Sequence, residues 1–259
     1  MKVVIFAGGL GTRIAEETDA RPKPMVEIGG KPILWHIMKI YSHYGFNEFI
    51  ICLGYKGYLI KEYFMNYFLH NSDIKIDLEN NNMQILGTRS ESFKVTLVET
   101  GLSTKTAGRL QQVMKYVGNE DFLLTYGDGV SDVNMTALID FHKKNGKIAT
   151  VTSVQPDARF GGMNLSADNV VNTFREKAKV DAQWINGGFF VLKPEISQYL
   201  QKDMSNIMWE EEPLEKLTSD KQMVAFKHKG FWKCMDALRD KIELNELWES
   251  GKAPWKIWK

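Results

Sequence analysis

The chain has 259 residues, 44% of them hydrophobic, and a formal net charge of +1. This length can bury the core of one large α/β domain, and the near-neutral charge argues against nucleic acid or a membrane surface as a partner. No apolar run approaches the ~18 residues of a membrane span and no leader precedes Lys2, so we expect a cytoplasmic protein. Cys52 and Cys234 lack metal-ligand spacing, and we expect buried free thiols.

The first predicted element is a buried strand that runs into a glycine-rich loop. Four apolar residues precede Gly8, Gly9 and Gly11, a pattern typical of a strand that ends in a turn. Because these glycines lack a Cβ, their backbone N–H groups can approach a ligand closely. Together with Thr12 and the guanidinium of Arg13, such N–H groups suit a polyphosphate.

A second cation follows the loop. Lys23 lies between Pro22 and Pro24, in an extended segment that cannot continue a helix. With Arg13 it predicts a phosphate cradle bordered by two cations. A dinucleotide fingerprint would need glycine at the position of Ile14, so the loop is weak evidence for a nicotinamide cofactor. A tight turn without any ligand is the other interpretation.

The next elements alternate between helix and strand. A helix is predicted from 32 to 41, a strand over 48–54 and a helix over 57–69, an order that favours a parallel sheet with right-handed crossovers. His36 lies in the first of these helices and is expected to be packed rather than catalytic. Alternating apolar residues over 74–92 predict a projecting β-hairpin, which could be a surface flap, a subunit contact or a lid.

A polar loop follows the strand predicted over 94–98, and a further helix follows the loop. Open α/β sheets bind ligands at loops on the carboxyl ends of their strands. In the loop at 99–110, small residues such as Thr104 and Gly108 would let a flat base lie close, and Arg109 could reach a phosphate. An ordinary loop with a helix cap is the alternative.

The strand predicted over 121–126 ends in a glycine turn that presents a carboxylate. Asp128 stands between Gly127 and Gly129, a suitable position for binding a hard cation. Aspartates in turns also serve local hydrogen bonding alone, and this interpretation stays open.

The following stretch predicts a helix over 134–145 that ends at Gly146, then strands over 148–154 and 184–192. Glycine inside a strand often marks a ligand close to the backbone. The side chain of Asn186, in the second of these strands, offers both a donor and acceptors to sugar hydroxyls.

The last part predicts a helix from 209 to about 218, a strand over 223–228 and a final helix that reaches 251. Acidic residues in the first turn of the helix at 209 suit the helix dipole without any catalytic role. Asp236 is a good N-cap for the final helix, which explains it without chemistry.

Taken together, these motifs resemble those of a known family. Gly8-Gly9-Leu10-Gly11-Thr12-Arg13 with Lys23-Pro24 resembles the signature of the sugar-1-phosphate nucleotidyltransferases. Arg159-Phe160-Gly161-Gly162 resembles the family's aromatic-Gly step against the sugar. Phe174-Arg175-Glu176-Lys177-Ala178-Lys179 resembles its Glu-Lys-Pro motif, with alanine in place of the usual proline, which leaves Lys177 less constrained.

The resemblance implies roles for individual residues. The implied catalytic residues are Arg13, Lys23, Asp128, Lys177 and Asp236, and the implied ligands of Mg²⁺ are Asp128 and Asp236. The implied nucleotide contacts are Phe6, Ala7, Gly8, Gly9, Leu10, Gly11, Thr12, Arg13, Lys23, Thr104, Gly108, Arg109 and Asp128. The implied sugar-phosphate contacts are Gly127, Gly161, Glu176, Lys177, Lys179, Asn186 and Gly187.

The implied fold is α/β, a Rossmann-like, mostly parallel mixed sheet flanked by helices (the nucleotide-diphospho-sugar transferase fold), as a single domain over 1–259 with a hairpin insertion at 74–92. The acidic segment at 209–213 and the closing tail at 251–258 favour the glucose-1-phosphate cytidylyltransferase branch. That branch implies CTP and glucose 1-phosphate as substrates and CDP-glucose as product, which would feed deoxysugar and polysaccharide synthesis.

Three alternatives stay open. The same chemistry could use UTP, dTTP or another sugar 1-phosphate, since base and sugar choice depend on hydrogen-bond geometry. A non-catalytic subunit could bind the same ligands as a signal, and a nicotinamide-dependent dehydrogenase is a third hypothesis. The hairpin and the seven tryptophans suggest a homo-oligomer.

Overall fold

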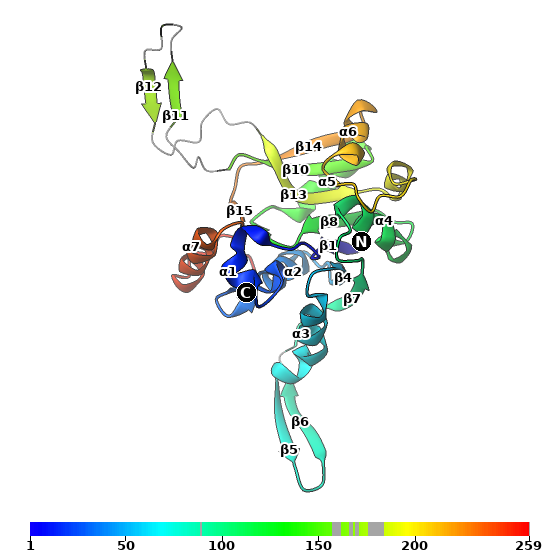
Figure 1. Ribbon diagram of the computed structural model, residues 1–259, viewed down its shortest axis with the longest axis vertical. Helices are drawn as coiled ribbons and strands as arrows, with labels where there is room; N and C mark the ends of the chain where they lie inside the picture. The colour runs from blue at the N-terminus through cyan, green and yellow to red at the C-terminus, as the bar shows by residue number, and fades with distance from the viewer. Residues whose placement is uncertain (89, 157–161, 166–167, 169–170, 176–183, 259) are drawn as a thin grey trace.

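The computed structural model describes residues 1–259 except 89, 157–161, 166–167, 169–170, 176–183 and 259. Its centre is a seven-stranded sheet in the order β14-β10-β13-β8-β1-β4-β7 (Figure 1). Strand β13 is antiparallel to both of its neighbours, and the other neighbouring pairs are parallel. The predicted mostly parallel mixed sheet is therefore confirmed. The strands are β1 (Val3–Phe6), β4 (Glu48–Leu53), β7 (Lys94–Glu99), β8 (Phe122–Tyr126), β10 (Ala149–Val154), β13 (Ile185–Leu192) and β14 (Met223–His228).

Helices cover both faces of this sheet, because side chains alternate along each strand and both faces are apolar. Val3 and Ile5 of β1 belong to one buried cluster with α2, α5 and α7, whereas Val4 and Phe6 belong to the other with α4 and α6. The helices are α1 (Ala15–Thr18), α2 (Ile33–His43), α3 (Gly57–His70), α4 (Thr106–Val117), α5 (Met135–Asn145), α6 (Glu212–Ser219) and α7 (Leu238–Glu249), with 3-10 turns at Thr12–Ile14, Lys23–Met25 and Pro194–Tyr199. None of the described helices is long and apolar enough to span a bilayer.

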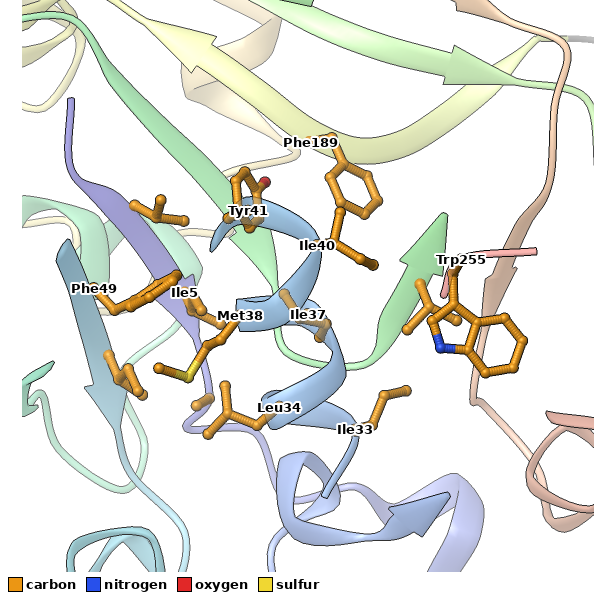
Figure 2. Packing of buried hydrophobic residues seen from close by; sticks show 14 of the residues in the cluster. Ile5, Ile33, Leu34, Ile37, Met38, Ile40, Tyr41, Phe49, Phe189 and Trp255 are labelled. Carbon is orange, nitrogen blue, oxygen red and sulfur yellow. The ribbon is translucent and has the colours of Figure 1, made fainter. Parts of the chain in front are cut away.

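Helix α2 shows how tightly the first cluster is packed. Figure 2 shows Met38 of this helix on the side of Ile5 and Phe49 of the sheet, and all three side chains belong to one buried cluster. Tyr41 also contacts Phe189 of β13, with ring centroids 6.0 Å apart. These contacts fix the strands whose carboxyl ends carry the loops described below.

Short strand pairs lie outside the central sheet. They are β2 (Glu27–Ile28) with β3 (Lys31–Pro32), β5 (Ser72–Asp77) with β6 (Asn82–Thr88), β9 (Gly129–Ser131) with β15 (Trp232–Cys234), and β11 (Gly162–Leu165) with β12 (Val171–Arg175). The pair β5–β6 follows α3 directly and extends away from the sheet, and it overlaps the segment 74–92 where a hairpin was predicted (Figure 1). The pair β9–β15 joins two distant parts of the chain beside the carboxyl end of β8.

Helix ends follow the sequence where the capping signal is local. Asn134 accepts a hydrogen bond from the Ala137 N–H at 3.0 Å, and Gly146 ends α5 with φ +67°. Three predicted helix starts were wrong, one of them that of α6, which begins at Glu212 rather than at residue 209. Helix α4 begins at Thr106, inside the segment predicted as a loop, and Asp236 does not cap α7. The Asp240 carboxylate instead accepts the N–H groups of Asp236 and Ala237.

The tryptophans are mostly a packing feature. Trp209 and Trp255 are fully buried, so the expectation that exposed tryptophans point to a partner is not supported at these positions. Trp255 of the closing tail stacks on Phe231 and on Trp248 of α7. His36 is buried among these rings and contacts the Ile28 carbonyl oxygen at 2.8 Å, and burial lowers the pKa of His36 to about 4. The prediction of a packed histidine is confirmed, and the tail holds α7 against α2.

Candidate active site

Two adjoining cavities lie at the carboxyl edge of the parallel strands, because the loops after β1, β7 and β8 leave the sheet on the same side. The larger cavity encloses about 530 Å³ and is lined by Phe6, Ala7, Gly8, Gly9, Leu10, Gly11, Thr12, Arg13, Lys23, Pro24, Leu102, Ser103, Thr104, Lys105, Thr106, Arg109, Tyr126, Gly127, Asp128, Met208 and Glu210. The smaller cavity encloses about 330 Å³ and is lined by Arg13, Thr125, Tyr126, Asp128, Gly129, Asn186, Gly187, Phe189, Glu210, Trp232, Cys234 and Asp236.

The glycine loop forms one side of the larger cavity. Gly11 has φ +67°, a backbone conformation that favours glycine. Among the described residues, the backbone N–H groups of residues 8–11 have no acceptor within the chain. A row of free N–H groups beside the Arg13 guanidinium is a suitable binding site for phosphate oxygens.

Lys23 lies between two carboxylates that are far apart in the sequence. Its Nζ donates to Asp128 Oδ2 at 2.6 Å and to Asp236 Oδ1 at 2.7 Å, and its side chain is only 10% exposed. Burial alone would lower the pKa of Lys23, but the charge and hydrogen bond of Asp128, followed by those of Asp236, raise it above its ordinary value. Lys23 is therefore a fixed positive charge within the site.

Asp236 contacts both predicted cations. Its Oδ1 accepts from Lys23, and its Oδ2 accepts from Arg13 Nη1 at 2.9 Å. Burial alone would raise the pKa of Asp236, but the hydrogen bond and charge of Lys23, with the charge of Arg13, lower it. The carboxylate points into the site and leaves the capping of α7 to Asp240, so the interpretation of Asp236 as a mere cap is wrong.

The two carboxylates fit a divalent cation. Their oxygens share one ammonium partner, so they lie no farther apart than the sum of the two short contacts to Lys23. Within the described residues, no group of three or more His, Cys, Asp and Glu side chains could hold a metal ion. Two carboxylates without further protein ligands are typical of Mg²⁺, which keeps several waters and takes phosphate oxygens of its substrate.

Arg109 has a different position from the predicted one. It lines the larger cavity, but its guanidinium is buried and donates to the carbonyl oxygens of Leu53 and Gly8 and to the Thr100 hydroxyl. The prediction that Arg109 reaches a phosphate is therefore not supported, because these donors already bind the chain itself. A Cβ at Gly8 would lie 2.1 Å from this guanidinium, so Gly8 is needed for the close approach. Arg109 holds the glycine loop in place.

Gly108 also differs from its prediction. It does not line either of the two cavities as the structure describes them, and a Cβ there would lie 2.7 Å from the Ser205 Cα. Its small size serves the packing of α4 rather than contact with a base.

Cys234 was expected to be buried, yet it is partly exposed and lines the smaller cavity, while Cys52 is fully buried as predicted. Burial, followed by the charges of Asp236 and Asp128, raises the pKa of Cys234 to about 12.

The other predicted residues fall into two groups. Residues 6–13, Lys23, Thr104 and Gly127 line the larger cavity, and Asn186, Gly187 and Asp236 line the smaller one. Gly161, Glu176, Lys177 and Lys179 lie outside the described residues.

Sequence reasoning missed two residues in the wall between the cavities, Tyr126 and Glu210. Tyr126 was assigned only to a strand, and Glu210 was explained by the dipole of a helix that in fact begins two residues later. The one available signal for Tyr126 was its position immediately before the Gly127-Asp128 turn. No local signal could have found Glu210, because its partners lie 84 and 104 residues away.

The sequence is similar to those of known proteins over its full length. The family model described as nucleotidyl transferase matches residues 2–249. The chain is 56% identical over 259 residues to a glucose-1-phosphate cytidylyltransferase of Salmonella typhi, and the match covers all of both chains. It is 47% identical over 258 residues to a protein of Bacillus subtilis (strain 168) named probable glucose-1-phosphate cytidylyltransferase, again over the full length of both.

Solved structures show the same fold. HddC from Yersinia pseudotuberculosis has a TM-score of 0.69 at 24% identity, over 95% of this chain and 99% of its own. A UDP-glucose pyrophosphorylase complexed with UDP-glucose has a TM-score of 0.68 at 18% identity, over 96% and 98% of the two chains. Both likenesses concern the fold alone.

Proposed function

This chain belongs to the nucleotidyl transferase family, and from that premise we propose that it transfers the cytidylyl group of CTP to glucose 1-phosphate. The products are CDP-glucose and pyrophosphate. The identity of 56% over the full length of a glucose-1-phosphate cytidylyltransferase supports both substrates. The structural observation that carries the proposal is the cluster of Arg13, Lys23, Asp128 and Asp236 where the two cavities meet.

The two reactants are both anions, so the site must neutralise charge and align them. A phosphate oxygen of glucose 1-phosphate attacks the α-phosphorus of CTP in line, and pyrophosphate leaves. This oxygen is already ionised at neutral pH, so no general base is needed. We assign the nucleotide to the larger cavity and the sugar phosphate to the smaller one, which brings the reacting atoms to their shared wall.

Each cation has a separate task in this assignment. Arg13 and the free N–H groups of the glycine loop stabilise the leaving pyrophosphate, and Lys23 offsets charge at the α-phosphate. Lys177, which lies outside the described residues, is assigned to the attacking phosphate from the family resemblance.

Enzymes of this family work with a divalent metal, and we propose that the metal here is Mg²⁺ held by Asp128 and Asp236. When bound, it neutralises charge on the nucleotide phosphates and makes the phosphorus more electrophilic. The two carboxylates and their shared ammonium partner support this assignment.

The test is pyrophosphate release by the purified protein, with four nucleotides tried against several sugar 1-phosphates in the presence of Mg²⁺. The highest kcat/KM is expected for CTP with glucose 1-phosphate. A higher value for UTP or dTTP, or for another sugar, would correct the substrates and keep the reaction. Binding of these ligands without turnover in any combination would favour a regulatory subunit instead.

We further propose that the protein forms a homo-oligomer through α3 and the β5–β6 hairpin. Apolar side chains on this segment are exposed, with Met65 78%, Leu78 89% and Leu86 61% exposed. Large exposed apolar patches are typical of protein interfaces. Sedimentation of the purified chain should show an oligomer, and Leu78→Asp with Leu86→Asp should shift it toward the monomer. A monomeric wild type would contradict this proposal.

A further inference from the structure

Four of the residues that the structure describes line both cavities, and two of these four have no part in the phosphate chemistry proposed above. Arg13 and Asp128 lie at the reacting end of the shared wall, whereas Tyr126 and Glu210 form the rest of it. A polar pair between two binding cavities would be costly to bury unless its hydrogen bonds were satisfied, and these bonds are well defined.

The bonds form a chain with one direction of donation. The Tyr126 hydroxyl donates to Glu210 Oε1 at 2.5 Å and accepts from Asn186 Nδ2 at 3.1 Å. Asn186 Oδ1 accepts from the Gly188 N–H at 2.8 Å, which fixes the amide orientation. The Thr106 hydroxyl donates to Glu210 Oε2 at 2.8 Å. Tyr126 therefore holds two polar side chains in place at once.

Aromatic packing keeps this arrangement rigid. The Tyr126 ring lies between Phe6 and Phe190, with centroid distances of 6.1 and 6.2 Å, and Phe190 packs edge-on against Trp209 at 5.8 Å. Trp209 directly precedes Glu210, and its backbone N–H donates to Thr106. The carboxylate is thus supported from both its own backbone and its hydrogen-bond partners.

The carboxylate retains capacity for a ligand. Two carboxylate oxygens offer about four acceptor sites, and within the part of the chain that the structure describes, two hydroxyls take two of them. A carboxylate only accepts, so the ligand group must be a donor. Oε1 lies on the side of Tyr126 and Asn186, where the smaller cavity is, and this cavity is assigned above to the sugar phosphate.

We propose that Glu210 determines specificity by accepting a hydrogen bond from one hydroxyl of the sugar 1-phosphate, and that Tyr126 is the positioning residue that holds Glu210 and Asn186 for this contact. The proposal rests on the proposed function in its assignment of the smaller cavity to the sugar. It adds two residues that the phosphate chemistry does not require.

The first experiment compares glucose 1-phosphate with a series of deoxyfluoro analogues, each with fluorine in place of one hydroxyl. Fluorine does not donate, so one analogue should lose at least about tenfold in kcat/KM with the wild type. In Glu210→Gln, this particular penalty should shrink to about threefold or less, because the amide can donate toward fluorine. The attacking atom is a phosphate oxygen, so ring fluorination itself affects reactivity little.

The second experiment uses Tyr126→Phe, which keeps the packed ring and removes only the hydroxyl. The KM for glucose 1-phosphate should rise by about tenfold, while the affinity for CTP alone, measured by calorimetry, stays within about twofold. Tyr199→Phe is the matched control, because the Tyr199 hydroxyl also donates to a carboxylate, Asp220, but lines neither cavity in the described structure. It should leave both constants unchanged.

The outcomes separate this inference from the proposed function. If the wild type turns over CTP and glucose 1-phosphate but Glu210→Gln leaves every fluorine penalty unchanged, the inference is overturned and the function stands. A changed preference for CTP over UTP in Glu210→Gln, with the fluorine pattern intact, would mean that the carboxylate contacts the base. If no turnover is found, the affinities of glucose 1-phosphate and its deoxyfluoro analogues are measured by equilibrium binding instead. If each analogue then binds to the wild type and to Glu210→Gln with equal affinity, the inference is again overturned.

Discussion

The two predicted cations occupy contrasting surroundings. Lys23 is 10% exposed and bound to two carboxylates, whereas the Arg13 side chain is 73% exposed and bound to one. Lys23 is therefore preorganised by the chain, while Arg13 can turn toward a ligand from an open loop. Under the proposed function, we therefore infer that Lys23 serves both the stability of the site and its chemistry, and that Arg13 serves the chemistry alone.

The largest expected effect is that of Lys23→Met. It removes the charge at the centre of the cluster and leaves Asp128 and Asp236 facing each other, so turnover should fall by about a thousandfold. The melting temperature at neutral pH should also fall, because the variant loses a buried pairing of opposite charges. Calorimetry beside a turnover assay checks both effects. If Lys23→Met lost activity but kept its melting temperature, Lys23 would contribute no more to stability than Arg13, and the contrast between them would be wrong.

Arg13→Ala is expected to lower turnover by about a hundredfold, the lower end of the range for losing one transition-state donor, because Arg13 is less preorganised than Lys23. Its melting temperature should stay unchanged, because exposed ion pairs contribute little to stability. Arg21→Ala is the matched control, since Arg21 also pairs with one carboxylate, Glu27, and is likewise exposed. Near-normal turnover in Arg13→Ala would rule out its assigned role.

Asp236→Asn tests the carboxylate that joins both cations. The Mg²⁺ concentration for half-maximal turnover should rise by at least about tenfold, as the loss of even a supporting contact does at other metal sites. Binding of Mn²⁺ followed by electron paramagnetic resonance gives a readout that is independent of activity. An unchanged metal requirement would leave Asp236 with only its contacts to Lys23 and Arg13.

The smallest expected effect concerns pH. The pKa of Asp236 is lowered on folding, so its contribution to stability is present above the unfolded pKa of about 3.9 and is lost as the pH falls through the folded pKa. The pKa of Lys23 is raised, so its contribution is complete below 10.5 and is lost as the pH rises through the folded pKa. The free energy of unfolding, measured in urea, should differ most between the wild type and Lys23→Met at pH values between these two limits. A constant difference across the range would contradict the pairing.

Much of the fold could be predicted because its signals are local. Apolar runs predicted the central strands, and Gly146 predicted the C-terminal end of α5 to the residue, while its start was predicted to within one residue. The glycine loop could also be predicted from the sequence, because its row of free N–H groups depends on a backbone conformation that neighbouring residues determine. The start of α4 was placed wrongly because the backbone N–H groups of Lys105 and Ala107 donate to the carbonyl oxygens of Ser205 and Ile207, about a hundred residues later in the chain.

The sequence by itself determined which residues end the strands and which charges they present, since strand, turn and glycine conformations depend on residues close in the chain. Only the tertiary structure decided which of those charges meet. Asp236 reaches Lys23 across 213 residues, and Arg109, a plausible phosphate contact from its loop, turns inward to four groups of the chain. The reason is that strand order, rather than local pattern, brings loop ends together at one edge of a sheet, and burial then selects the partner of each polar side chain.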